Sequence, residues 1–213
     1  MDIKGRYRRT LLGPFWLTIS MAFTAISIGF VFGKLFNADM SVAIPYFVVG
    51  TVIWSFIAGG IDESATLLGL NGAFIRSSPM PVLFHILRMV HRNFFFMLHN
   101  ALIIPVLWLV FPWSMSWQIL LVPLALAICY IFVASISTIV AIFCVRYRDL
   151  APLVRMVTQF MYFTTPIIWQ PQQMTAARWV VDYNPLAYLV QIVRGPLIGQ
   201  SVDGITWLVA IAI

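Results

Sequence analysis

Few side chains in this sequence could do chemistry, and they form no known catalytic set. Asp62 and Glu63 are adjacent carboxylates at the end of a long apolar run. Carboxylates at the edge of a membrane are costly unless they are paired or hydrated, which makes them candidate site residues. Arg88 and Arg92 lie four residues apart, so one hypothesis pairs Asp62 with Arg88 or Glu63 with Arg92 across a helical hairpin. The alternative is that both carboxylates face water.

Sequence motifs of enzymes, metal sites and nucleotide sites are missing. There is no G-x-S-x-G, no H-E-x-x-H and no Cys/His cluster, and the histidines are scattered. Residues 29–34 differ from a phosphate-binding loop, and instead match the G-x-x-x-G pattern of helix packing. We therefore expect this chain to bind no cofactor and no metal, and we expect Cys129 and Cys144 to be packing residues.

The composition indicates a membrane protein. Hydrophobic residues make up 62% of the 213 residues and charged residues 9%, whereas soluble domains carry about 25% charged residues. The net charge of +6 would suggest nucleic acid as a partner of a soluble protein. Here the basic residues flank apolar runs, so we expect contact with membrane lipids and not with nucleic acid.

The apolar runs predict an all-α, polytopic membrane protein with six spans, because one span needs ~20 apolar residues. The expected spans are residues 15–32, 44–61, 94–111, 119–145, 153–169 and 205–213. They form a single transmembrane domain over residues 1–213, with no sizeable soluble domain. The last run covers about half of a ~30 Å hydrocarbon core, so we expect that span to be incomplete and the sequence to be shortened.

The distribution of Lys and Arg predicts the orientation. With a cytoplasmic N-terminus, ten basic residues fall on inner segments and three on outer segments. This is the positive-inside pattern, and it places the protein in the inner or plasma membrane. The inner residues are Lys4, Arg6, Arg8, Arg9, Arg76, Arg88, Arg92, Arg146, Arg148 and Arg155, and the outer ones are Lys34, Arg178 and Arg194.

Two inner segments are candidates for contact with the membrane surface or a partner. Residues 1–13 place apolar side chains on one helical face, which is typical of an interfacial helix; a plain basic flank is the alternative. Residues 71–81 predict a short projecting helix with an apolar tip, suited to docking in a partner's groove; a loop lying on lipid headgroups is the alternative. The residues concerned are Lys4, Arg6, Tyr7, Arg8 and Arg9 in the first, and Asn71, Phe74, Ile75, Arg76 and Pro79 in the second.

The short inner loop before the fifth expected span is a possible second contact with the same partner. It carries Arg146, Arg148 and Asp149. We expect Asp149 to cap the helix that Pro152 begins, because proline is tolerated in the first turn. This structural role alone is sufficient to explain Asp149.

The outer segment, residues 169–204, is too apolar for a free loop and too interrupted for a span. A re-entrant pair of short helices fits this composition, with Asn184-Pro185 starting the second helix. Its dense aromatic residues could line a channel for a sugar chain, although an interfacial aromatic belt is the simpler explanation. The candidate channel or gate residues are Tyr162, Trp169, Trp179, Tyr183, Asn184 and Pro185.

The N-terminal residues 2–16 resemble the opening of permease subunits of type-2 ABC exporters, especially those that export O-antigen, capsule or teichoic acid chains. The family pattern is K-x-R-Y-[KR]-x-[ST]-x-L-G-x-x-W. The turn Arg146-Tyr147-Arg148-Asp149 and the pair Asn184-Pro185 add to the likeness. The residues that match the opening pattern are Lys4, Arg6, Tyr7, Arg8, Thr10, Leu12, Gly13 and Trp16.

This resemblance implies six spans per subunit and a homodimer around a translocation channel. It also implies two copies of a separate ATPase subunit, which use ATP and Mg and dock on residues 71–81. The implied cargo is a lipid-linked polysaccharide, as in lipopolysaccharide O-antigen or capsule export. The alternatives are export of a drug or other small molecule, a membrane-embedded lipid or sugar transferase, and a non-catalytic assembly protein.

Overall fold

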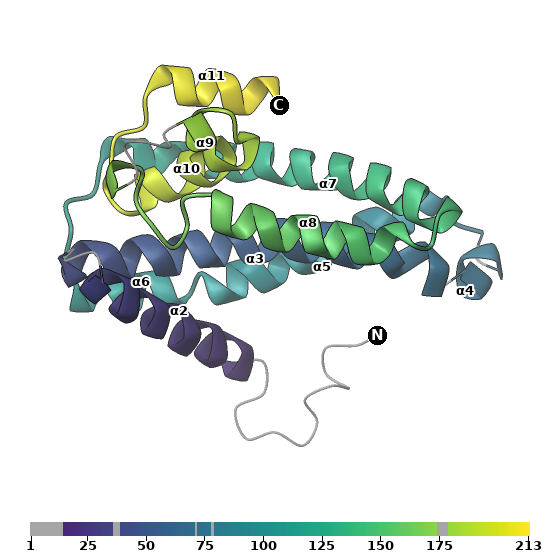
Figure 1. The fold of residues 1–213 in the computed structure, drawn as a ribbon, viewed down its shortest axis with the longest axis horizontal. Helices are drawn as coiled ribbons and strands as arrows, with labels where there is room; N and C mark the ends of the chain where they lie inside the picture. The colour runs from purple at the N-terminus through teal and green to yellow at the C-terminus, as the bar shows by residue number, and fades with distance from the viewer. Residues whose placement is uncertain (1–14, 36–38, 71, 78, 174–178) are drawn as a thin grey trace.

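The computed structural model describes residues 15–35, 39–70, 72–77, 79–173 and 179–213, and every regular element in these ranges is a helix. This confirms the all-α class for the described residues; the expected interfacial helix over residues 1–13 lies outside them. Long helices lie side by side, with α4 at one end and α10 and α11 toward the other (Figure 1). The elements are α2 (Phe15–Leu35), α3 (Met40–Leu70), α4 (Gly72–Ser77), α5 (Val82–Asn100), α6 (Ile103–Val110), η1 (Trp117–Leu121), α7 (Val122–Arg146), α8 (Leu150–Thr164), η2 (Pro171–Gln173), α9 (Trp179–Asp182), α10 (Pro185–Leu197) and α11 (Gly204–Ala212).

Three helical stretches in the described residues are long and apolar enough to cross a membrane. They are Met40–Leu70, Val82–Val110 and Trp117–Arg146, of 31, 29 and 30 residues. A shorter apolar helix covers Ile19–Leu35. At 1.5 Å per residue each long stretch exceeds the ~30 Å hydrocarbon core. The structure thus confirms a multi-pass membrane protein, while the count of six spans stays a prediction.

Helix α3 is the centre of the bundle, and it packs against α2, α5, α7, α8 and α10. Its side chains are buried around its whole circumference over residues 43–50, which is typical of a fully enclosed helix. Asp39 caps its first turn, since the Asp39 carboxylate accepts hydrogen bonds from the Ser41 amide at 2.9 Å and hydroxyl at 2.8 Å. These bonds lower the pKa of Asp39, which keeps this carboxylate charged at the start of the helix.

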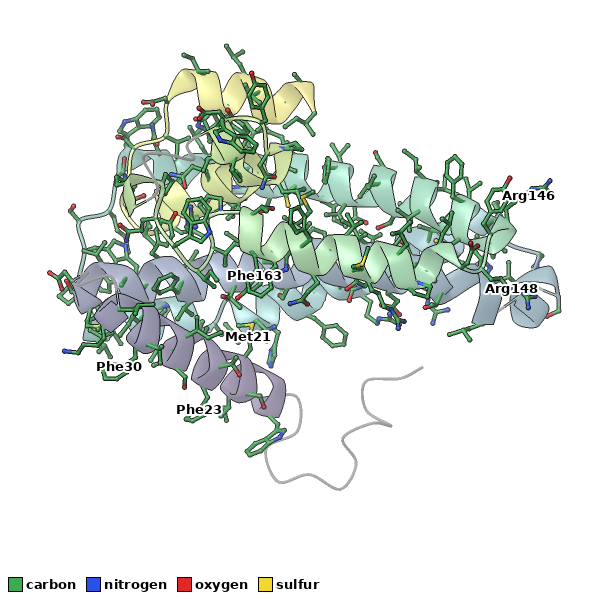
Figure 2. All side chains as sticks on the ribbon, viewed as in Figure 1. Met21, Phe23, Phe30, Arg146, Arg148 and Phe163 are labelled. Atoms are coloured by element: carbon green, nitrogen blue, oxygen red, sulfur yellow. The ribbon has the colours of Figure 1, made fainter. Side chains whose placement is uncertain are left out.

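Small residues allow the neighbouring helices to approach α3 closely. On α2, a Cβ added to Gly29 would lie 3.0 Å from the Phe47 ring, and one added to Gly33 would lie 2.9 Å from Met40. This confirms the helix-packing interpretation of the G-x-x-x-G pattern. Figure 2 shows Phe23 and Phe30 on the side of α2 that faces away from the bundle, where both are exposed.

The fifth expected span, residues 153–169, has the wrong boundaries. Helix α8 runs from Leu150 to Thr164, and Thr165 is extended with φ −79° and ψ 135°. Residue 166 is a proline, whose ring disfavours helical geometry at the residue before it, so the helix ends there. The predicted cap is also wrong, because Asp149 has helical geometry and makes no side-chain capping bond.

The second and third expected spans are also longer than predicted. Helix α3 continues past Asp62 and Glu63 to Leu70, so these carboxylates lie on a helix face and not at its end. The third span begins at Val82, and the helix is interrupted between Asn100 and Ile103. Pro105 explains the interruption, because it has no amide to donate and its ring clashes with the carbonyl four residues earlier.

Substitution of Gly60 tests the close contact between α3 and α7. A Cβ at this position would lie 2.5 Å from Cγ1 of Val133, a side chain that is stiff in a helix. We expect Gly60→Ala to lower stability by about 1–2 kcal/mol, because overpacking outweighs the gain in helix propensity. The measurement is the thermal unfolding midpoint of the detergent-purified protein.

The matched control is Gly69→Ala on the same helix, where no atom lies within 4 Å of the added Cβ. It should keep or raise the midpoint, since only helix propensity changes. An equal rise of the unfolding midpoint in both variants would contradict the close contact between α3 and α7 at Gly60.

Candidate functional site

The two predicted cytoplasmic contacts lie at one end of the bundle, which we call the α4 end. It consists of α4, the end of α3, the start of α5 and the turn between α7 and α8 (Figure 1). Arg146 and Arg148 are labelled at this end in Figure 2, and both are exposed together with Asp149. Segments that are about 70 residues apart in sequence therefore lie at the same end of the bundle.

Helix α4 forms the tip of the hairpin between α3 and α5, as the sequence predicted for residues 71–81. Its six residues run from Gly72 to Ser77. Ile75 is half-buried and Pro79 is exposed. Asn71 and the side chains of Phe74 and Arg76 lie outside the described part of the structure.

An ion pair closes this hairpin below its tip. Arg92 of α5 donates to one carboxylate oxygen of Glu63 on α3, and the Asn93 amide donates to the other at 3.0 Å. This confirms the predicted Glu63–Arg92 pair. Each of the two charged side chains keeps 37% exposure, so we expect a modest net contribution to stability.

Asp62 faces a different neighbour, because successive side chains of a helix are about 100° apart. It lies beside Thr158 and near the charge of Arg155, both on α8. Oδ1 of Asp62 is buried without a hydrogen-bond partner. The adjacent carboxylates of α3 therefore face two different helices: Glu63 pairs with Arg92 of α5, and Asp62 faces α8.

Helix α8 has a broad exposed face, which we call its open face, on which two polar side chains, Arg155 and Gln159, lie among apolar ones. Arg155, Gln159 and Phe163 recur every four residues and are exposed, as is Phe160. Thr158 is buried on the side that faces Asp62, and Arg155 borders that side. Charged side chains within membrane segments normally face protein or water. Sequence reasoning missed Arg155 and Gln159 as site residues, although their four-residue spacing within an apolar helix was a usable signal.

At the other end, Asn184 and Pro185 start α10 as predicted. The Asn184 side-chain oxygen accepts a hydrogen bond from the Leu186 amide at 3.0 Å, and Pro185 occupies the first turn. The Asn184 amide also donates to the Thr165 hydroxyl at 2.9 Å. Asn184 is buried, so it acts as a structural link within one chain.

The aromatic gate candidates fall into two groups. Trp169 is buried, and its indole N–H donates to the Phe163 carbonyl at 2.9 Å. Tyr162 is half-buried beside Trp54, with 5.8 Å between the ring centroids. Trp179 and Tyr183 are exposed, at 64% and 84%. Of these four aromatic residues, only Trp179 and Tyr183 present most of their surface to the outside.

At this end, the segment that contains Trp113 and Gln118 is hydrogen-bonded to the segment that contains Leu197 and Val202. Gln118 of η1 forms a pair of hydrogen bonds with the backbone of Val202, and the Trp113 indole donates to the Leu197 carbonyl. Gly199 has φ +75°, and an added Cβ would lie 2.0 Å from the Ser114 carbonyl oxygen. Glycine is therefore required at this turn.

The described residues offer no group of three or more metal-ligating side chains. A groove of about 340 Å³ between α7 and α11 is almost wholly apolar. Its lining consists of Ile128, Ile131, Phe132, Ser135, Ile136, Ile139, Ala210, Ile211 and Ile213. Ser135 donates its hydroxyl proton back to the Ile131 carbonyl, so the groove holds no catalytic arrangement.

The helical bundle and the structures at its two ends define a multi-pass membrane protein with a projecting helical hairpin at one end. Residues 2–198 match the ABC-2 type transporter family, and the chain belongs to this family. The predicted resemblance is therefore confirmed. Membership makes the chain a transmembrane component and implies an ATPase partner.

One relative is similar to this chain over most of its length. The chain is 24% identical over 192 residues to the O-antigen export system permease protein RfbA of Klebsiella pneumoniae. The alignment covers 89% of this chain and 74% of that protein. The similarity extends along most of the chain and is not confined to one motif.

A double-mutant cycle tests the ion pair that closes the hairpin. Glu63→Gln and Arg92→Gln should each lower the unfolding midpoint, and the double variant should lose less than the sum of both. We expect a coupling of about 0.5–1 kcal/mol, because both side chains are partly hydrated. Arg88→Gln, on the exposed face of α5, is the control and should show no coupling to Glu63→Gln. Additive losses for Glu63 and Arg92 would refute an energetic pair.

Proposed function

We propose that this chain is the permease subunit of an ATP-driven exporter that moves a lipid-linked polysaccharide outward across the bacterial inner membrane. Two copies would enclose the channel, and two copies of a separate ATPase would hydrolyse ATP with Mg at the cytoplasmic side. The observation that carries this proposal is the projecting α3–α4–α5 hairpin, in a chain that matches the ABC-2 family over residues 2–198.

The α4 end is the proposed docking surface for the ATPase. It combines the hairpin tip with the exposed Arg146 and Arg148 of the α7–α8 turn. The positive-inside pattern of the sequence supports a cytoplasmic position for this end. The Glu63–Arg92 pair would stiffen the hairpin, so that a push on α4 moves α3 and α5 together.

The open face of α8 is the proposed channel wall and dimer contact. Arg155 and Gln159 are polar side chains exposed on this face, which supports its cover by a second copy or a water-filled channel. Phe160 and Phe163 on the same face offer aromatic surfaces on which sugar rings can slide. The similarity to an O-antigen export permease supports a polysaccharide as cargo.

Docking is tested by co-expressing the full protein with its candidate ATPase and purifying the membrane subunit. The ATPase should copurify, and Phe74→Asp or Arg76→Glu should abolish this, because each places a negative charge on the proposed docking helix. Trp117→Asp is the matched control: it makes an exposed aromatic residue acidic at the opposite end and should leave copurification intact.

Copurification that is indifferent to both α4 changes would refute the docking surface. Complete independence from any ATPase would refute the transporter proposal and favour a transferase. If the assembled complex transports small molecules but no polysaccharide, the cargo assignment is wrong.

The dimer contact is tested by cysteine cross-linking in membranes, in a background where the buried Cys129 and Cys144 are replaced by alanine. Phe163→Cys on the open face of α8 should give a cross-linked dimer with a short bismaleimide, because the two copies meet there. Ile142→Cys, equally exposed but on α7, is the control and should stay monomeric. The reverse result would place the dimer contact on α7.

A further inference from the structure

Arg194 is a fully buried arginine on α10, which sequence reasoning counted only as an outer basic residue. Its relative exposure is 1%. Among the described residues its partners are neutral: Nη1 donates to the Pro166 carbonyl at 2.6 Å, and Nη2 donates to the Gln191 side-chain oxygen at 2.7 Å. The guanidinium carbon lies 3.6 Å from the centroid of the Tyr46 ring.

A buried guanidinium without a carboxylate is costly to maintain. Desolvation of one charge costs several kcal/mol, and Nε of Arg194 has no hydrogen-bond partner. The carbonyl, the amide and the aromatic face offset only part of this cost. An apolar side chain of similar size would avoid this desolvation cost. The arginine is therefore explained by the contacts that its guanidinium makes.

These contacts join α10 to the outer end of α8 at two points. Asn184, at the start of α10, binds the Thr165 hydroxyl, and Arg194, three turns later, binds the Pro166 carbonyl. The same carbonyl accepts a hydrogen bond from the Tyr46 hydroxyl of α3 at 3.1 Å. Residues 165–166 directly follow the last residue of α8, so α10 holds the turn in which α8 ends.

The space for the guanidinium is created by a glycine of α3. A Cβ added to Gly50 would lie 3.3 Å from Nη1 of Arg194 and 3.4 Å from the Ile167 side chain. Any larger residue would press on the guanidinium and on the turn that it holds. Gly50 thus gives a second, independent way to perturb this contact without removing the arginine.

We propose that Arg194 is a positioning residue that, together with Asn184, makes α10 move as one body with the outer end of α8. The link requires a planar guanidinium, because it must donate in two directions while stacking on Tyr46. In the exporter proposed above, movement of the channel wall would then carry the outer helices with it and open the mouth of the channel. This last step rests on the proposed function, whereas the joint movement of α8 and α10 does not.

The test measures the distance distribution between spin labels at Phe163→Cys on α8 and Tyr183→Cys beside α10, both exposed in the protein. The full permease is placed in nanodiscs, with Cys129 and Cys144 replaced by alanine and labelled copies diluted in unlabelled ones. The distribution should be narrow in the parent and clearly broader in Arg194→Met and in Gly50→Ala. Arg194→Lys keeps the charge but not the fork geometry, so it should stay broader than the parent.

Gly59→Ala is the matched control on α3, because its added Cβ would meet only the Asn93 side chain, at an ordinary 3.5 Å. It should leave the distribution narrow. Unchanged distributions in both Gly50→Ala and the Arg194 variants would overturn the proposal, and so would full recovery by Arg194→Lys, since charge alone would then suffice.

A second readout separates positioning from mere stability in the complex with the ATPase. Arg194→Lys should keep ATP hydrolysis near the parent value, while export per ATP falls about fivefold or more. Parallel losses in proportion to the amount of folded protein would mean that Arg194 only stabilises the fold. If the distribution broadens as expected but no ATPase or cargo is found, the joint movement stands and the proposed exporter function fails.

Discussion

The whole structure depends on the burial of α3 as one continuous helix from Met40 to Leu70. A helix that satisfies its own backbone hydrogen bonds can extend through the membrane and beyond it without another support. Features at both ends of the bundle involve this helix: the Glu63–Arg92 pair and Asp62 near α4, and Tyr46 and Gly50 near α10. The two ends of the bundle are therefore mechanically connected by a rigid element, not by a loop.

Much of this fold could be predicted from the sequence, because apolar runs and basic flanks reflect burial in the membrane directly. The helical class, the family, the Glu63–Arg92 pair and the start of α10 at Asn184-Pro185 were all readable from residue types and spacing. The ends of helices were harder to predict from the sequence, since hydropathy does not reflect backbone effects. The expected span continued past Thr165-Pro166 to Trp169, whereas the backbone geometry before proline ends α8 there.

The tertiary role of a polar residue could not be predicted where its partners are distant and neutral. Arg194 finds Pro166 and Tyr46, which are 28 and 148 positions away, and none of these partners carries a complementary charge. By contrast, Glu63 and Arg92 have opposite charges on two helices joined by a short hairpin. Charge complementarity is visible in a sequence, whereas carbonyl and aromatic partners of a cation become visible only once the chain is folded.

The open face of α8 also bears on how the protein is made. A helix of 15 residues is about 22 Å long, shorter than the ~30 Å hydrocarbon core, and α8 carries Arg155 and Gln159 among its exposed residues. Such a segment partitions poorly on its own as it leaves the ribosome. Because α8 packs against α3, we expect α3 to assist its entry into the bilayer, which would couple insertion of this chain to its folding.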